Sequence, residues 1–480
     1  MNNLFSAARI KKDRNFDGTF FFGVKTTGIF CRPSCPSPIA KEENVLYFQS
    51  IFEALERGLR PCYRCRPDIE VDYYGGNPDS EFVVGSALKM IYDGYLNYHS
   101  VADLANELLL SDRHLRMLFV EHLGVPPVKI AKMHKSLFAK KLLLFSNRSV
   151  TDIAYASGFR SLRQFNDVFK ELFGTSPTMV RKELKSQGSA NGNSTLLLKY
   201  KESFDFRQIL SFMKMRAMDG VEVITDESYS RTFRTENADG YFTVTDTIDK
   251  SALELRIDSD DIRCYMEIYN RVRRMFDLDR DFTAINEKFQ KDKVLSKGMV
   301  AGHVPRLPVA FNSFEFAVRA VLGQQISVKA ATTLASRIAH KANLKTGDEF
   351  PEGLDCYFPK ATELFSIKID DLGITKIRQE TIKTVTEAIL AEKVKLTPNQ
   401  SFEQFYNDFS ALKGIGDWTV NYVAMRGLGM VDSFPASDLG VIKALTEDNV
   451  VRTQKEIIKL AEKWRPYRSY AALCLWNSNS

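Results

Sequence analysis

Long apolar runs are absent from this chain of 480 residues, and no stretch reaches the roughly 20 apolar residues that a membrane-spanning helix needs. The first 14 residues lack the apolar core of a secretory signal and carry Asp13 among their basic residues. These absences argue against an integral membrane protein or a secreted one and predict a cytoplasmic protein. The length predicts three or four domains of ordinary size.

Cysteine and tryptophan are scarce, with seven and three residues respectively. Cys264, Cys356 and Cys474 stand singly, as buried thiols in a reducing compartment usually do. Positive and negative charges balance over most of the chain. Residues 1–190 hold 26 of the 66 Lys and Arg and 20 of the 60 Asp and Glu, so the net charge of +6 lies within them. A basic surplus confined to one part suggests a polyanionic partner there.

The remaining four cysteines form two close pairs, with three residues between the first two and two between the last two. Two such pairs offer a tetrahedral four-thiolate site to one zinc ion, and a segment of about 70 residues has too little core to fold well without such a metal. Two disulfides are the alternative, which the lack of any secretory feature disfavours. The predicted metal ligands are Cys31, Cys35, Cys62 and Cys65.

Residues 80–185 have apolar residues at helical spacing and contain an internal repeat, because 100–105 matches 149–154 and the similarity continues beyond both segments. Each copy has a Ser N-cap, a short helix with small residues, a turn and a second helix, as a helix-turn-helix does. A plain helical repeat with solvated faces is the alternative. The polar residues that begin the second helices suit base edges and phosphates: Arg113, His114, Arg116, Arg160, Arg163, Gln164 and Asn166.

The fold class predicted is multidomain, mostly α with α+β parts. A small zinc module spans 1–75, a double helix-turn-helix 80–185, and a polar linker 186–194. A small mixed α/β lobe follows at 195–300 and a helical domain at 301–480. After the linker, β-like runs are expected at 195–198, 221–225, 241–244 and 252–257.

Several of these motifs resemble known families. Residues 153–177, with Ser157-Gly158-Phe159 and Gly174-Thr175-Ser176-Pro177, look like the AraC-type transcription activators. Residues 26–35, 43–45 and 60–65 are similar to the N-terminal domain of the Ada-type regulators of the response to alkylation. That resemblance implies a zinc-bound thiolate at Cys31 that accepts a methyl group from a methylphosphotriester in DNA. It also implies that Thr27 and Arg60 touch the phosphate. A purely structural zinc is the alternative.

The C-terminal part contains Leu412-Lys413-Gly414-Ile415-Gly416-Asp417-Trp418, which reads as a glycine-turned hairpin between helices that can bind a phosphate through backbone N–H groups. Together with 434–441, 321–327 and 464–470, it resembles the helix-hairpin-helix glycosylases of the AlkA type, which release 3-methyladenine from DNA. The Pro-Cys-His-Arg motif of the second Ada methyltransferase domain is absent.

The glycosylase resemblance implies that Asp438 is the catalytic carboxylate, which stabilises positive charge on the sugar after the base is flipped out of the stack. Bifunctional relatives carry lysine where this chain has Trp418, so strand cleavage is not expected. Gln325 aligns with the residue that fills the gap left by the flipped base, and Lys413, Gly414 and Gly416 would contact the backbone. The implied base pocket comprises Trp418, Tyr422, Trp476, Phe212 and Arg216.

The sequence therefore predicts a DNA-alkylation response protein: a methylphosphotriester-accepting activator fused to a monofunctional glycosylase for alkylated purines. The alternative is a regulator whose C-terminal domain binds DNA without catalysis. Expected cofactors and partners are one zinc ion, double-stranded DNA and RNA polymerase, with a monovalent cation at the hairpin carbonyls as a further candidate. The protein is expected to be a bacterial, nucleoid-associated monomer with no membrane partner.

Overall fold

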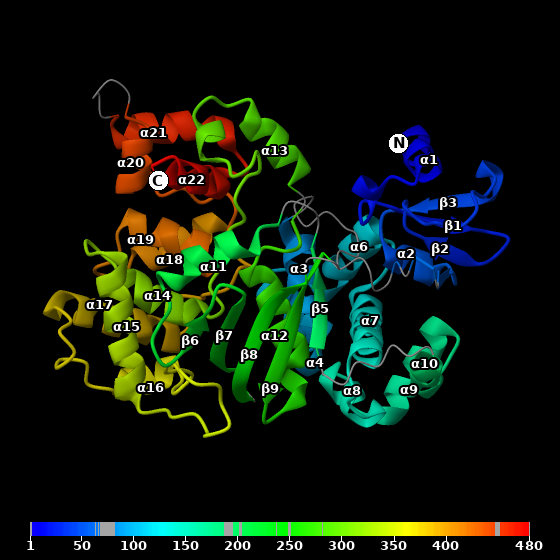
Figure 1. Cartoon of the computed structure of the whole chain (residues 1–480), viewed down its shortest axis with the longest axis horizontal. Coiled ribbons are helices and arrows are strands. Elements are labelled where there is room, and N and C mark those ends of the chain that lie inside the picture. The colour runs from blue at the N-terminus through cyan, green and yellow to red at the C-terminus, as the bar shows by residue number, and fades with distance from the viewer. Residues whose placement is uncertain are drawn as a thin grey trace. The chain divides into compact units, whose positions relative to one another are not determined.

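The computed structural model describes residues 2–62, 64, 65, 67, 82–186, 195–200, 204–236, 238–247, 251–280, 282–446 and 452–479 (Figure 1). They form two compact units, of which unit 1 comprises 1–199 and 252–270, and unit 2 comprises 200–251 and 271–480. No helix among the described residues is long and apolar enough to cross a membrane. The joint expected at 75–78 and positions 187–194 of the expected linker fall outside the described residues.

Unit 1 begins with a small four-stranded sheet in the order β3–β1–β2–β4. Its strands pair antiparallel except for β2 and β4, which run parallel. Phe20, Phe21 and Phe30 are fully buried, which gives this small segment an aromatic core. Its elements are α1 (Asn2–Lys11), β1 (Phe21–Val24), β2 (Ile29–Cys31), β3 (Val45–Phe48), α2 (Ile51–Glu56) and β4 (Arg60–Pro61).

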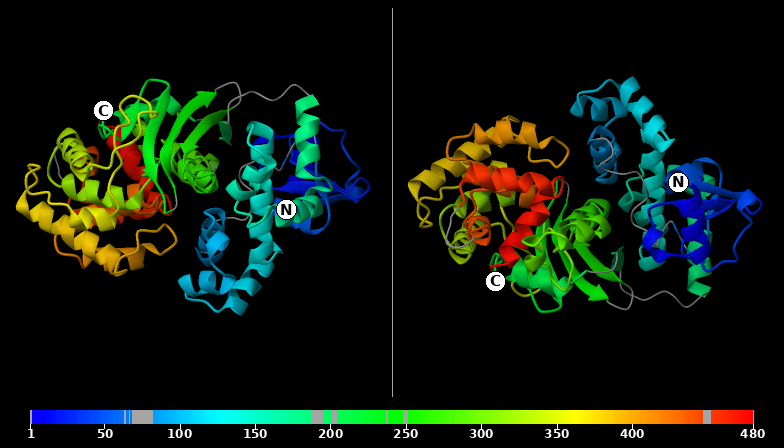
Figure 2. Two further views of the ribbon diagram at one scale, coloured as in Figure 1. Left: turned by 90° about the horizontal axis from the view of Figure 1, so that it is seen from below. Right: turned by 90° about the horizontal axis from the view of Figure 1, so that it is seen from above.

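Helices make up the next part of unit 1, as the periodicity of 80–185 predicted. Both repeat copies use the same caps: Ser100 forms a capping box with Asp103, and Ser149 forms one with Asp152. The long helix α7 joins the copies and contacts the helices of the second (Figure 2). The helices are α3 (Phe82–Tyr92), α4 (Tyr95–Tyr98), α5 (Val101–Glu107), α6 (Asp112–Leu123), α7 (Pro127–Phe145), α8 (Val150–Ala156), α9 (Leu162–Phe173) and α10 (Pro177–Ser186).

The four predicted β runs are confirmed. In unit 1, β5 (Thr195–Lys199) pairs antiparallel with β9 (Ala252–Ser259). In unit 2, β7 (Ser228–Arg234) pairs antiparallel with both β6 (Glu222–Ile224) and β8 (Asp239–Thr247) (Figure 1). The prediction missed β7, because its polar residues hide the alternation of apolar side chains that marks a strand.

The rest of unit 2 is helical, as predicted for 271–480. Helix α14 packs against α15 and α17, and α18 packs against α19 (Figure 1). The helices are α11 (Phe206–Lys214), α12 (Tyr265–Met275, which begins in unit 1), α13 (Thr283–Gln290), α14 (Ser313–Leu322), α15 (Val328–Ala342), α16 (Ala361–Ser366), α17 (Lys376–Leu390), α18 (Phe402–Ser410), α19 (Asp417–Tyr422), α20 (Leu439–Ala444), α21 (Gln454–Ala461) and α22 (Arg468–Asn477).

Candidate active site and metal centre

The four predicted metal ligands meet at one point in unit 1. Cys31 ends β2 and Cys62 follows β4, so the parallel pairing of these strands brings the two cysteine pairs together. The Sγ atoms of Cys31, Cys35, Cys62 and Cys65 all lie within 4.8 Å of one another, and all four residues are buried. Around one zinc ion, four thiolates at about 2.3 Å lie nearly 4 Å apart, so the cluster fits a tetrahedral zinc site.

Asp17, which the sequence analysis did not single out, fixes the loop between the first two cysteines. Its Oδ1 accepts from the backbone N–H of Ser34 at 3.0 Å, and its Oδ2 accepts from the Ser34 hydroxyl at 2.6 Å. The Arg32 guanidinium pairs with the same carboxylate at 3.2 Å. The two predicted phosphate ligands of this module are both exposed: Thr27 lies in the turn between β1 and β2, and Arg60 lies on β4.

The predicted DNA contacts of the repeat lie mostly on open surface. Arg113, His114, Arg160 and Gln164 are exposed, and the side chain of Arg163 is 93% exposed. Several of these residues also have local partners. Arg116 pairs with Asp112 at 2.9 Å, and Asn166 donates to the Leu162 carbonyl on its own helix at 2.9 Å. Arg160 donates to the Asn97 carbonyl at 3.3 Å, and Arg163 forms a long ion pair with Asp167 at 3.9 Å. Both second helices, α6 and α9, therefore present polar side chains outward at their N-terminal ends.

In unit 2, Asp438 is the N-cap of α20 and is held by four donors. Its Oδ1 accepts from the backbone N–H groups of Gly440 at 2.9 Å and Val441 at 3.2 Å. The indole Nε1 of Trp476 donates to Oδ1 at 2.8 Å, and that of Trp418 donates to Oδ2 at 2.8 Å. The carboxylate is thus fixed between two aromatic rings that sequence reasoning assigned to one site.

Asp438 and these rings line a cavity of about 340 Å³, large enough for a purine base. The ring of Tyr422 stacks on Trp418 at 4.8 Å and meets Trp476 edge-on at 6.3 Å. Arg216 also lines the cavity, and its guanidinium lies 3.7 Å from the centre of the Phe212 ring. The structure therefore brings together the five predicted pocket residues and the predicted carboxylate.

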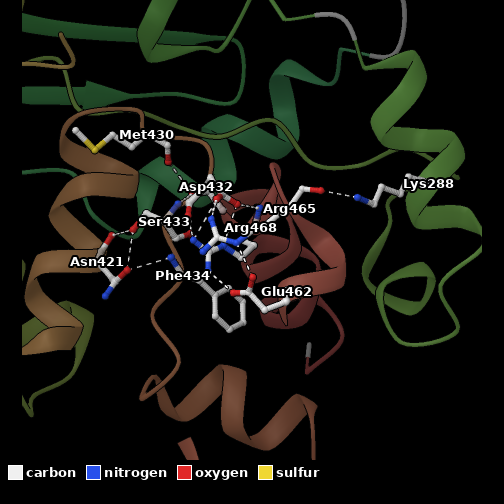
Figure 3. A network of polar contacts seen from close by, with 10 residues as sticks. Lys288, Asn421, Met430, Asp432, Ser433, Phe434, Glu462, Arg465 and Arg468 are labelled. Atoms are coloured by element: carbon white, nitrogen blue, oxygen red, sulfur yellow. Dashed lines mark hydrogen bonds and ion pairs between the residues drawn. The ribbon is translucent and has the colours of Figure 1, made fainter. Parts of the chain in front are cut away.

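A polar network gathers on the segment between α19 and α20, which leads to Asp438 (Figure 3). Asn421, three residues after Trp418, accepts from the Ser433 hydroxyl at 3.0 Å and from the Phe434 N–H at 3.1 Å. Arg468 at the start of α22 binds Asp432 through two nitrogens, at 2.9 and 3.1 Å. The segment that leads to Asp438 is thereby tied to both α19 and α22. The sequence analysis did not single out Asn421, because only its position three residues after Trp418 relates it to this site.

The predicted DNA-contacting loops are linked by Gln324, which sequence reasoning passed over in favour of its neighbour. The Gln324 Nε2 donates to the Gly414 carbonyl at 3.0 Å and to the Thr419 hydroxyl at 3.1 Å. Gln325 is exposed and has φ +55°, a left-handed conformation that costs a non-glycine residue about 1 kcal/mol. The loop around Gln325 is thus anchored to the glycine hairpin.

Within that hairpin the two glycines differ. Gly414 has φ +88°, and a Cβ there would lie 2.1 Å from the Thr381 hydroxyl, so only glycine fits. Gly416 caps α19 with no side-chain cap and has no atom within 4 Å of its would-be Cβ, which leaves its surroundings open. Lys413 is exposed beside them.

A buried ion-pair cluster lines part of the cavity. Arg231 pairs with Glu315 at 2.6 Å, and Arg319 pairs with Glu222 at 3.3 Å and with Glu315 at 3.2 Å. The arginines lower the pKa of Glu222 against the opposing effect of burial, which is the larger single influence. Arg426 lines the same cavity outside this cluster. Nothing in the spacing of these residues reveals the cluster in the sequence.

Three family descriptions match successive parts of the chain: the metal binding domain of Ada over residues 5–68, a helix-turn-helix domain over 104–183, and the AlkA N-terminal domain over 195–312. The first supports zinc as the metal of the four-cysteine cluster.

Whole proteins also resemble the chain. The probable bifunctional transcriptional activator/DNA repair enzyme AlkA of Mycobacterium tuberculosis is 34% identical over 473 residues, which cover 97% of this chain and 94% of that protein. The bifunctional activator/repair enzyme AdaA of Bacillus subtilis is 34% identical over 39% of this chain and 85% of its own. DNA-3-methyladenine glycosylase 2 of Escherichia coli is 29% identical over 58% of this chain and 95% of its own.

Proposed function

Because the chain belongs to the family of bifunctional transcriptional activator/DNA repair enzymes, we propose that it joins a methylphosphotriester-sensing activator to a monofunctional glycosylase for alkylated purines. The observation that carries the glycosylase part is the Asp438 carboxylate, held by two indole N–H groups at the edge of an aromatic cavity. The proposed domains are the zinc module 1–75, the activator 80–185, the linker 186–194, and the glycosylase lobes 195–300 and 301–480.

The cavity supports base release in three steps. A flipped base enters between the rings of Trp418, Tyr422 and Trp476, whose electron-rich faces attract a cationic alkylated purine by about 1–2 kcal/mol. As the N-glycosidic bond breaks, its electrons leave with the base, and Asp438 stabilises the positive charge that develops on the sugar. Water then bonds to the sugar carbon and loses a proton, which leaves a free base and an abasic site.

Outside the cavity, Gln325 is the proposed residue that fills the gap in the stack. Lys413, Gly414 and Gly416 hold the DNA backbone without reading its sequence. The hairpin carbonyls are a proposed site for a monovalent cation, although one of them, that of Gly414, already accepts from Gln324.

The zinc module supports a different reaction, which happens once per molecule. When zinc is bound it keeps the thiols deprotonated. The Cys31 thiolate attacks the methyl carbon of a methylphosphotriester, so an S–C bond forms, the C–O bond breaks and a phosphodiester anion leaves. Thr27 and Arg60 are exposed nearby to hold the phosphate. Because the site loses one negative charge, the module then binds DNA more tightly.

The double helix-turn-helix completes the response. Its proposed base and phosphate contacts are the seven residues at the starts of α6 and α9, among which the Arg163 side chain is 93% exposed. Its proposed action is to recruit RNA polymerase to damage-response promoters after Cys31 is methylated. The protein is proposed to act as a nucleoid-associated monomer in the bacterial cytoplasm.

The test of the enzyme is release of free 3-methyladenine from methylated duplex DNA by the full chain and by Asp438→Asn. Release by the wild type alone supports a glycosylase with Asp438 as its carboxylate. No release by either leaves a regulator whose C-terminal part only binds DNA. The test of the sensor is mass spectrometry of the Cys31 peptide after the same incubation, where a gain of one methyl group is expected. An unchanged mass would make the zinc structural only.

A further inference from the structure

The start of α17 exposes a large apolar side chain close to the residues that are proposed to contact DNA. Ile377 is 74% exposed, although isoleucine is among the residues most often buried. Its neighbour Lys376 is exposed as well, and so is Lys413 of the hairpin. A single exposed isoleucine is ordinary on a protein surface, so its position relative to the proposed DNA contacts decides what it can do.

A hydrogen bond ties the start of α17 to the loop that carries Gln325. Arg378, the residue after Ile377, donates from Nη2 to the backbone carbonyl of Gln324. Ile377 and Gln325 therefore each lie one residue away from the same hydrogen bond, and both are exposed. One apolar and one polar side chain are thus held close together on the same surface.

The glycine hairpin is tied to the same place. The Thr381 hydroxyl donates to the Ile377 carbonyl at 2.9 Å, and this hydroxyl also occupies the space where a Cβ of Gly414 would lie. The Gln324 side chain in turn donates to the Gly414 carbonyl at 3.0 Å. Ile377, the Gln325 loop and the hairpin are therefore parts of one hydrogen-bonded assembly, and DNA that contacts one of them comes close to the others.

The arrangement of these parts around the cavity indicates which DNA strand Ile377 faces. Gly323 and Ile326 are among the residues that line the cavity, whereas Ile377 and Arg378 are not. The start of α17 thus reaches the Gln325 loop from outside the cavity. If the flipped base fills the cavity and Gln325 fills the gap it leaves, Ile377 lies beyond that gap, toward the partner strand.

We propose that Ile377 is an apolar wedge that inserts between stacked bases of the partner strand, beside the base left without its pair. This inference rests on the proposed glycosylase function. Proteins that kink DNA insert side chains such as Ile, Leu or Phe between base steps and unstack them. Gln325 is suited to hydrogen-bond the unpaired base but offers little apolar surface, which Ile377 supplies. Lys376 and Lys413 add positive charge that complements the phosphates.

Unstacking of the partner strand can be measured without catalysis. The full-length protein is bound to a duplex that carries tetrahydrofuran, a stable analogue of an abasic site. In two such duplexes, 2-aminopurine, which fluoresces more strongly when unstacked, is placed in the partner strand on one or the other side of the opposing base. The wild type should raise the fluorescence in at least one duplex. Ile377→Ala should remove at least about half of that rise, and Ile377→Leu should retain it.

Base release provides a second measurement. In single-turnover release of 3-methyladenine, Ile377→Ala should slow the reaction on methylated duplex DNA by about 5- to 30-fold and change it by less than about twofold on single-stranded DNA, which has no stacked partner strand. Leu390→Ala is the matched control, because Leu390 ends the same helix and is 41% exposed. It should match the wild type in both measurements.

The possible failures can be told apart. Because Ile377 is mostly exposed, Ile377→Ala should keep the Tm of the wild type, so a folding defect would not mimic the expected result. An equal rise of fluorescence in the wild type and in Ile377→Ala overturns the wedge, and so does the lack of any rise in the wild type. If the wild type unstacks the partner strand through Ile377 but releases no base from either substrate, the proposed glycosylase fails while the wedge stands.

Discussion

The indole N–H of Trp418 donates to one oxygen of Asp438 at 2.8 Å, and that of Trp476 donates to the other at 2.8 Å. The aromatic wall and the carboxylate are therefore one assembly, in which each ring has both a face for the base and a polar edge for the acid. Removing an indole N–H while keeping a ring separates these two roles.

Trp418→Phe should retain DNA binding and lower the single-turnover rate of base release by about tenfold, because the ring remains and one fixed donor to Asp438 is lost. Trp464→Phe is the matched control. Trp464 also donates its indole N–H to a carboxylate, Asp292, at 2.9 Å, but it is fully buried outside the cavity. It should cost stability and leave the rate unchanged. If Trp418→Phe leaves the rate of base release unchanged, the hydrogen bond from Trp418 to Asp438 has no role in catalysis.

Gln324→Leu should weaken the link between the Gln325 loop and the hairpin, since both side-chain bonds of Gln324 are lost. We expect kcat/KM to fall by about three- to tenfold on duplex DNA and to change less on single-stranded DNA, where no partner strand must be held apart. Gln379→Leu in α17, which removes a comparable side-chain bond to the backbone carbonyl of Ile374, serves as control. Equal losses on both substrates would indicate a general folding defect.

Asp17→Ala should lower zinc affinity by about 10- to 100-fold, because outer residues that orient metal ligands contribute on that scale. Asp17 ties Ser34, which lies beside Cys35, through two hydrogen bonds of 3.0 and 2.6 Å. Competition with a chromogenic chelator measures the affinity, and Glu43→Ala, an exposed carboxylate of the same module, should match the wild type. An unchanged affinity in Asp17→Ala would show that the cysteine loop holds its shape without it.

Acid should loosen the helix-turn-helix segment through His134, which stacks on Tyr92 at 4.6 Å and is 6% exposed. Burial, with a smaller effect of Lys135, lowers the pKa of His134 to about 3. Between pH 6.5 and 3, His134 binds a proton in the unfolded chain but not in the folded chain. The free energy of unfolding therefore falls as pH falls, by roughly 1 kcal/mol per unit, and is unaffected by this group above pH 6.5.

The readout is hydrogen exchange of the α7 amides between pH 7 and pH 4, corrected for intrinsic rates. In His134→Phe the protection should lose most of its pH dependence, whereas His99→Phe, at an exposed ring, should behave as the wild type. If the protection of the α7 amides still falls with pH in His134→Phe, groups other than His134 cause the loss of stability in acid.

Arg163→Ala should weaken DNA binding by the helix-turn-helix without changing stability, since the side chain is 93% exposed and its ion pair to Asp167 is long, at 3.9 Å. If Arg163 contacts phosphate, the salt dependence of binding should flatten by about one ion; if it contacts a base, discrimination between sequences should fall instead. Arg263→Ala, another exposed arginine of unit 1 outside the repeat, should do neither.

Sequence reasoning succeeded where the chemistry depends on local spacing. The paired cysteines, the Ser caps of the repeat and the glycines of the hairpin each act within a few residues, and the structure brings the four thiols and the six glycosylase pocket residues into two clusters. Resemblance to known families supplied the pairing of Asp438 with Phe212 and Arg216, which no pattern in the chain could give.

It failed where a function needs partners distant in sequence. Arg231 and Glu315 are 84 positions apart, and Gln324 and Gly414 are 90 apart. Strand β7 was missed because its polar residues hide the alternation of a strand; one of them, Arg231, is buried in ion pairs with Glu222 and Glu315 on other elements. Nothing in the local sequence distinguishes Arg426 from other basic residues. Only the structure shows that its Nη1 is buried without a hydrogen-bond partner among the described residues.

The crowding around Asp438 has a consequence for the water that completes the reaction. Each carboxylate oxygen offers two lone pairs, and the three donors at Oδ1 and the one at Oδ2 leave a single direction open. Asp438 is therefore built to oppose a cation rather than to strip a proton from the incoming water. If no proton is transferred while the glycosidic bond breaks, the rate of base release should be nearly the same in heavy water as in light water.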